Sequence, residues 1–212
     1  MKLYHSFRPH PKVGAGREVR ITLAEKGLEI AMQDLDMTTR ENRKPEYLAK
    51  NPTGQLPFLE LDDGRAVSEG IAICELLEDL HPDPPVVGRT AEEKAETRMW
   101  LRRIEFGIAE NIVNGFRFGE GRAFWEGRGR IVAEAADGLK ALARDKLEWL
   151  DGEMRKRTFI AGDRFTLADV ALVTALDFGE MVGQPLDPTL ESLAAWKRRV
   201  DERPSVKKSL AG

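Results

Sequence analysis

The spacing of apolar residues changes character near residue 80. Before that point, short apolar runs that are typical of strands alternate with segments whose apolar residues recur at the spacing of amphipathic helices. After it, every periodic segment has the helical spacing. The pattern predicts strands at 1–4, 30–35 and 58–61, and helices at 17–27, from 70 onward, 91–118, 129–155, 167–181 and 191–202.

This change divides the chain into two predicted domains. Residues 81–90 contain three prolines and a glycine, which interrupt helical structure. We therefore expect a first domain at 1–80, a linker at 81–90 and an all-helical domain at 91–212. The glycine-rich stretch 119–129 is expected to be a loop of the second domain.

Composition narrows the class of protein without indicating an activity. With 42% apolar and 33% charged residues, the chain is typical of a globular protein in water, and its 212 residues allow a large core. The net charge of −3 argues against a nucleic-acid partner, which usually requires a basic excess. No apolar run approaches the ~18 residues of a membrane span, and no signal peptide is visible. Because Cys74 is the only cysteine, no internal disulfide forms, and we expect a cytoplasmic protein.

The most informative segment is 51–73, which reads NPTGQLPFLELDDGRAVSEGIAI. Its first four residues have the composition of a turn, and the Asp-Gly pair at 63–64 is a hairpin signal after an apolar strand. Residues 68–70 then open a helix. Pro57 stands at the head of the strand, where a proline cannot donate to the hydrogen-bond ladder and is sometimes cis.

A cis Pro57 would turn the chain sharply and direct the N–H and C=O of Leu56 outward. These two groups can pair with an extended peptide as one more strand would. Glu69 and Gly70 lie at a helix start, where free N–H groups and the helix dipole favour a carboxylate, and the Glu69 side chain can take an ammonium group. The segment therefore predicts a site for a small peptide. The alternative is a domain whose proline is required by the fold and which binds no ligand.

With its Leu56-Pro57 pair and Glu69, this segment resembles the glutathione-binding half of the cytosolic glutathione S-transferase family. In that family a similar turn leads to a cis-proline, and a Glu-Ser pair opens the third helix. This chain has Gly70 where the family usually has Ser. The difference removes a hydroxyl group and keeps the backbone donor, so weaker glutathione binding is expected.

A second resemblance lies in the other half of the chain. Residues 162–169 match the folding motif of the same family closely. In physical terms, Thr166 caps a helix, Asp169 reaches back to it, and Phe165 packs on Val170. This motif predicts stability and carries no chemistry.

The resemblance implies an α/β thioredoxin-like N-terminal domain followed by an all-α helical-bundle C-terminal domain. It also implies glutathione as co-substrate, a small apolar electrophile as second substrate, and a homodimer. A metal is not expected, since the three histidines lack ligand spacing. The implied glutathione-binding residues are Asn42, Gln55, Leu56, Pro57, Glu69 and Gly70.

The group that activates the thiol is the main departure from the family. A free thiol has a pKa near ~8.5, so the protein must favour the anion with a hydrogen bond, a positive group or a helix N-terminus. In the family the helper is a Tyr, Ser or Cys, and the usual Ser or Cys position falls on Val13, which cannot donate. The remaining candidates are the hydroxyls of Ser6 and Tyr4, the backbone N–H groups of Gly14, Ala15 and Gly16, and the charges of Arg8 and Arg17.

We therefore expect a detoxifying glutathione transferase that conjugates the thiolate to an apolar electrophile. Two alternatives stay open. The departure at Val13 favours a non-catalytic glutathione-binding protein of the same fold. The spacing of residues 51–57 would also suit a glutathione-dependent isomerase, but the missing Ser argues against that branch.

Overall fold

A computed structural model describes residues 1–211. The chain folds into two compact units: an N-terminal unit made of Met1–Arg89 and residues 202–211, and a helical unit made of Thr90–Asp201. These units differ from the expected ranges 1–80 and 91–212, because both the proline-rich segment and the last residues pack with the first unit.

The N-terminal unit is built on a mixed sheet with the strand order β2-β1-β3-β4. β1 (Lys2–His5) pairs parallel with β2 (Ala31–Asp34) and antiparallel with β3 (Phe58–Glu60). β3 forms a hairpin with β4 (Ala66–Ser68), and the turn between them contains the expected glycine, Gly64, at φ +84°. The sheet confirms the predicted thioredoxin-like α/β domain.

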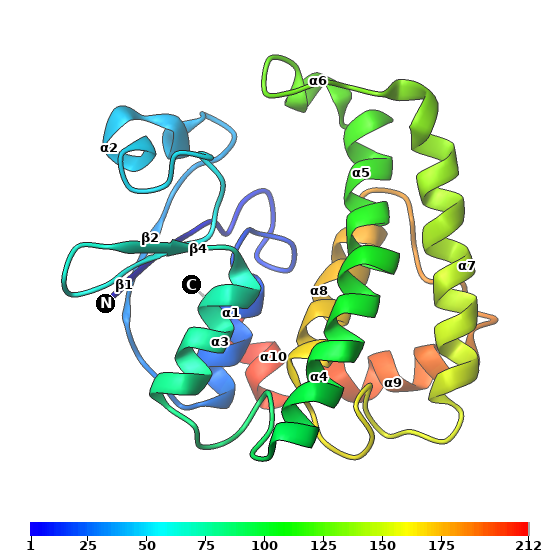
Figure 1. Ribbon diagram of the computed structural model, residues 1–212. Coiled ribbons are helices and arrows are strands. Elements are labelled where there is room, and N and C mark those ends of the chain that lie inside the picture. The colour runs from blue at the N-terminus through cyan, green and yellow to red at the C-terminus, as the bar shows by residue number, and fades with distance from the viewer. Residues whose placement is uncertain (212) are drawn as a thin grey trace. The chain divides into compact units, whose positions relative to one another are not determined.

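Helices lie on both faces of this sheet. α1 (Arg17–Glu25) and α3 (Gly70–Leu80) cover one face, and α2 (Pro45–Leu48) lies on the other, preceded by the short turn η1 (Glu41–Arg43) (Figure 1). Side chains alternate between the two faces along each strand. Tyr4 therefore stacks on Phe58 on one face, at a ring-centroid distance of 4.4 Å, while their neighbours Leu3 and Leu59 are buried on the other.

A buried ion pair attaches the predicted linker, residues 81–90, to the N-terminal unit. The Nζ atom of Lys26 lies 2.6 Å from Oε2 of Glu78. Both side chains also bind the backbone that follows α3: Lys26 donates to the carbonyls of His81 and Pro84, and Glu78 accepts from the N–H groups of Val86 and Val87. Because the buried charges are paired and hydrogen-bonded, they hold this segment firmly within the N-terminal unit.

The end of the described chain also belongs to the N-terminal unit. α10 (Pro204–Lys208) packs against α1, and Arg203 forms two hydrogen bonds of 2.9 Å with Glu25. Ser209 accepts hydrogen bonds from Nε of Arg17 through its hydroxyl, at 3.2 Å, and from Nε of Arg20 through its carbonyl, at 3.1 Å. The last turn of the chain therefore supports the beginning of α1.

Arg20 fixes the long loop between β1 and α1 from the inside. Its guanidinium donates to the carbonyl of Pro11 at 2.9 Å and lies 4.4 Å from the ring centroid of Phe7. A further N–H group lies 3.1 Å from Nδ1 of His5. Burial, together with the charge of Arg20, lowers the pKa of His5 to about 4. The imidazole is thus neutral at pH 7 and accepts the hydrogen bond from Arg20.

The helical unit is arranged around α8 (Leu167–Met181), which is buried along most of its length. The expected helix 91–118 is a single helical run, in which the π-helical turn η2 (Glu105–Ala109) separates α4 (Ala91–Ile104) from α5 (Glu110–Phe118) (Figure 1). The expected loop 119–129 contains a short helix that the pattern does not show, α6 (Arg122–Trp125). The elements around α8 are α4 (Ala91–Ile104), η2 (Glu105–Ala109), α5 (Glu110–Phe118), α6 (Arg122–Trp125), η3 (Ala133–Ala135), α7 (Ala136–Met154) and α9 (Glu191–Asp201).

Asp169 caps the start of α8, as the sequence predicts, and it also accepts hydrogen bonds from two other segments. Its Oδ2 accepts from the N–H of Thr166 at 2.9 Å, which completes the capping box. Its Oδ1 accepts from the N–H of Ile160 at 3.0 Å and from the indole N–H of Trp196 at 2.8 Å. One buried carboxylate therefore joins α8 to the preceding turn and to α9.

No helix in the described part of the chain, residues 1–211, is long and apolar enough to cross a membrane.

Replacement of Asp169 by Ala removes the acceptor of three N–H groups inside the helical unit. Each buried donor left without a partner costs about 1–3 kcal/mol, so for three donors we expect the free energy of unfolding to fall by about 3 kcal/mol or more. Urea denaturation measures the change. Asp163→Ala is the matched control, because this exposed aspartate of the same motif is expected to change stability by less than about 0.5 kcal/mol.

The low pKa of His5 predicts a specific loss of stability in acid. Between pH 6.5 and 4 the unfolded chain binds a proton that the folded protein excludes, so stability falls as the pH drops through this window. A difference between about 6.5 and about 4 corresponds to at most about 3 kcal/mol. Urea denaturation at several pH values should show a shallower dependence for His5→Gln, whereas His10→Gln, at an exposed histidine, should keep the parent dependence.

Candidate functional site

The loop that leads to Pro57 is braced by two buried asparagines. Asn51 donates from Nδ2 to the carbonyl of Gln55 at 3.0 Å, and Asn42 donates from Nδ2 to the carbonyl of Gly54 at 2.7 Å. Asn42 is only 4% exposed, so its side chain shapes the loop from within. The side chain of Gln55 is exposed beside it. A direct contact between Asn42 and a ligand stays a prediction.

Leu56 is the residue whose backbone this loop leaves free. Neither its N–H nor its C=O forms a hydrogen bond with any of residues 1–211. The peptide bond from Leu56 to Pro57 is cis. An extended peptide that lies alongside Leu56 would satisfy both groups in the manner of an added strand.

Pro57 lies directly against the N-cap residue of α1, Gly16. A Cβ atom on Gly16 would lie 2.9 Å from Cβ of Pro57 and 3.1 Å from Cβ of His5. Gly16 also has φ +87°, a conformation that other residues rarely adopt. Only glycine fits here, and its presence places the start of α1 next to the free backbone of Leu56.

The start of α1 offers backbone donors. The N–H groups of Val13 and Gly14 both donate to the carbonyl of His10, at 3.0 and 2.9 Å. Those of Ala15 and Gly16 have no partner among residues 1–211. Of the three expected backbone donors, two are therefore available to an anion, and they lie at the positive end of the helix dipole.

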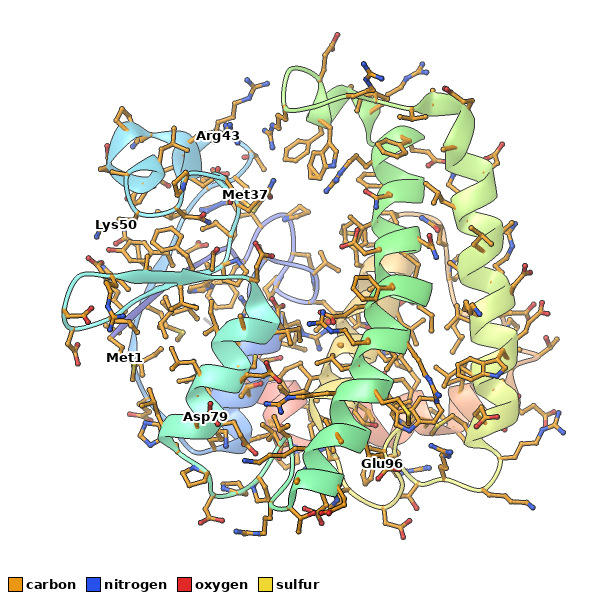
Figure 2. All side chains as sticks on the ribbon, in the orientation of Figure 1. Met1, Met37, Arg43, Lys50, Asp79 and Glu96 are labelled. Carbon is orange, nitrogen blue, oxygen red and sulfur yellow. The ribbon has the colours of Figure 1, made fainter. Side chains whose placement is uncertain are left out.

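Tyr4 lies in the core, with its hydroxyl already engaged. It donates to Oε2 of Glu60 at 2.8 Å and accepts from Nζ of Lys50 at 3.3 Å. Figure 2 shows Lys50 between α2 and the β3–β4 hairpin. Burial, and then the hydrogen bond to Glu60, raise the pKa of Tyr4. A thiol would have to compete with both partners for this hydroxyl.

Ser6 and the two arginines proposed as helpers also have partners within the unit. Ser6 is fully buried, and its Oγ accepts the N–H of Arg8 at 3.2 Å. The guanidinium of Arg8 pairs with Asp34 at 3.3 Å, and that of Arg17 donates to the carbonyl of Lys12 at 2.9 Å. Each of these side chains is therefore already engaged within the N-terminal unit, and their roles in catalysis stay predictions.

The start of α3 forms the third part of the site. Glu69 is its N-cap residue, is exposed, and has φ +70°. Such a conformation costs a non-glycine residue about 1–3 kcal/mol and is found mainly where function requires it. No side chain caps the helix, so its first N–H groups remain open to a carboxylate.

Gly70 has a neighbour that sequence reasoning did not identify. The side chain of Glu18, on α1, passes so close that its Oε1 atom occupies the place that a Cβ on Gly70 would take. Residues 18 and 70 are far apart in the chain, and no local pattern links them. Only the packing of α1 against α3 reveals this contact.

The site thus combines a free backbone edge at Leu56 with the open starts of α1 and α3. Each part suits one feature of a small acidic peptide: its backbone, an anionic sulfur and a terminal carboxylate. Among the residues that the structure describes, no group of three or more His, Cys, Asp or Glu side chains is placed to hold a metal ion.

Comparisons with known proteins identify the family of this chain. The family model for the glutathione S-transferase N-terminal domain matches residues 16–80, and that for the C-terminal domain matches residues 129–204. Glutathione S-transferase 2 of Saccharomyces cerevisiae is 34% identical over 201 residues, which cover 91% of this chain and 83% of that protein. Glutathione S-transferase GstA of Escherichia coli O157:H7 is 31% identical over 193 residues, or 90% of each chain.

A solved structure supports the same conclusion. The crystal structure of Gtt2 from Saccharomyces cerevisiae superimposes with a TM-score of 0.89 at 31% identity, covering 99% of this chain and 100% of that one. The fold and the relatives thus agree with one another. The chain belongs to the glutathione S-transferase family, whose members use glutathione as co-substrate.

Proposed function

We propose that this protein is a glutathione transferase that joins the sulfur of glutathione to a small apolar electrophile. The observation that carries the proposal is the free N–H and C=O pair of Leu56, set between the open starts of α1 and α3. Glutathione would lie along Leu56 and Pro57, with its γ-glutamyl end at Glu69 and Gly70. Gln55 is exposed at the edge of this path.

Activation of the thiol is assigned to the backbone at the start of α1. The N–H groups of Ala15 and Gly16 are unpaired, and the helix dipole favours a negative charge at this point. A sulfur held there loses its proton more easily than in water. The thiolate then gives its electron pair to a carbon of the electrophile, and the group displaced from that carbon leaves with its own bonding pair.

A second reaction has specific support among the relatives. The maleylacetoacetate isomerase of Pseudomonas aeruginosa is 28% identical over 212 residues. An isomerase returns glutathione unchanged, whereas a transferase consumes it, so titration of free thiol during turnover separates the two reactions. The third alternative is a protein that binds glutathione without lowering its thiol pKa.

The proposal also includes a homodimer in the cytoplasm with a role in detoxification, by analogy with the glutathione S-transferases that this chain resembles. Sedimentation of the purified protein tests the dimer, and cell fractionation tests the location.

Calorimetric titration with reduced glutathione and with S-methyl glutathione tests the proposed function. Both should bind, because both carry the peptide that pairs with Leu56. Ultraviolet thiolate absorbance should place the pKa of bound glutathione about 1–2 units below the free value near ~8.5. Binding with an unchanged thiol pKa would favour the non-catalytic alternative, and no binding of either compound would disprove the proposal.

Ser6→Ala and Tyr4→Phe decide between side-chain and backbone activation. The Tyr4 hydroxyl donates to Glu60 and Ser6 is fully buried, so each variant should keep the thiol pKa and kcat close to those of the parent. Removal of a donor that truly stabilises a reacting anion lowers kcat about 10²–10³-fold. A loss of that size in either variant, with the fold intact by circular dichroism, would assign activation to that hydroxyl instead.

A further inference from the structure

A half-buried arginine without an anionic partner lies at the corner where α6 packs against the end of α5, within the helical unit (Figure 1). The guanidinium carbon of Arg117, on α5, lies 5.2 Å from the ring centroid of Trp125, on α6. Its Nε atom is buried, and no hydrogen bond or ion pair joins the guanidinium to any of residues 1–211. The two terminal nitrogens are therefore open to an acceptor from outside the chain.

The acids nearest to Arg117 in the chain do not balance its charge. Glu120, three residues further on, accepts two hydrogen bonds from Nζ of Lys140, at 2.6 and 2.9 Å. Glu126 follows Trp125 directly, but it is exposed and forms no ion pair with Arg117 in the described part of the chain. A charge that is partly withdrawn from water without a counter-ion is costly. An anionic ligand at the terminal nitrogens would relieve this cost.

Aromatic rings form the rest of this corner. The ring centroids of Phe124 and Trp125 lie 4.5 Å apart, and the guanidinium carbon of Arg128 lies 4.1 Å from the ring centroid of Phe124. Phe124 is nevertheless 36% exposed, so part of its ring is open to a ligand. The indole N–H of Trp125 is buried and has no acceptor among residues 1–211. The corner therefore combines an accessible ring with a cation that lacks a counter-ion.

We propose that the α5–α6 corner is a binding site for an aromatic carboxylate, whose acid group pairs with the two terminal nitrogens of Arg117. The planar guanidinium suits a carboxylate, because its parallel N–H groups reach both oxygens at once. Stacking on Trp125 holds the guanidinium in place for this pairing. The ring of the ligand packs against Phe124, since aromatic rings favour stacked or edge-to-face contacts.

This site goes beyond the proposed function and does not depend on it. Arg117, Phe124 and Trp125 all belong to the helical unit, whereas the residues proposed to bind glutathione belong to the N-terminal unit. The two proposals can therefore be tested separately on the same protein.

Calorimetric titration with β-naphthoate and β-naphthamide tests the site, because the two compounds share a ring system and differ in charge. The parent should bind the acid about tenfold more tightly or better, as expected for hydrogen bonds between charged groups. Arg117→Gln should lose this preference, while its affinity for the amide changes little. Arg122→Gln is the matched control, because it removes the same charge from an exposed position on α6 and should keep the parent preference.

Arg117→Lys separates the shape of the guanidinium from its charge. Lysine keeps the positive charge but lacks the two parallel N–H groups that reach both oxygens of a carboxylate. The lysine variant should therefore prefer the acid less than the parent does and more than Arg117→Gln does. A full parent preference in Arg117→Lys would contradict the proposed two-nitrogen pairing.

Three further outcomes would overturn the site. They are equal binding of the acid and the amide by the parent, no binding of either compound, and an equal loss of preference in Arg117→Gln and Arg122→Gln, which would indicate a diffuse positive surface. Glutathione affinity, measured on the same variants, should stay at the parent value. A parent that binds β-naphthoate but not glutathione would disprove the proposed function alone, and thermal unfolding verifies that each variant is folded.

Discussion

The contact between Gly16 and Pro57 sets the geometry on which the rest of the site depends. It brings the N-cap of one helix to within van der Waals distance of the residue at the head of β3, and no side chain larger than hydrogen fits between them. The free backbone of Leu56 and the open N–H groups of α1 consequently lie together. Arg20 binds the loop between β1 and α1 through His5 and Pro11, so the residues before α1 are held in place on two sides without a ligand.

Much of this fold can be predicted because its signals act over a few residues. The helical period and the capping residue Thr166 locate α8 at 167–181, and Gly64 marks the hairpin turn where its φ value requires glycine. The turn at 51–54 and the helix start after Glu69 are equally local. The short helices α6 and α10 escaped prediction, since four or five residues are too few to show a period.

The partners of the polar side chains could not be predicted in the same way. Tyr4 and Asn42 belong to residue types that often contact ligands, and only the structure shows that Glu60 and Gly54 already hold their polar atoms. Glu18 shows the reverse: its sequence context suggests no role, and the structure reveals a contact. In the sequence it is an ordinary acid in the first turn of a helix, but packing between two helices that are distant in the chain places it next to Gly70. The sequence thus predicted which segments form the site better than it predicted which contacts each side chain makes there.

The two hydrogen bonds that Ser209 accepts from α1 have a consequence for the order of events during synthesis. A ribosome completes residues 90–201, the entire helical unit, before it adds the serine that supports Arg17 and Arg20. The strands and helices of the N-terminal unit emerge first, yet this support reaches the beginning of α1 only with the last turn of the chain. A nascent chain that has finished its helical unit is therefore still without part of the framework behind the proposed glutathione site.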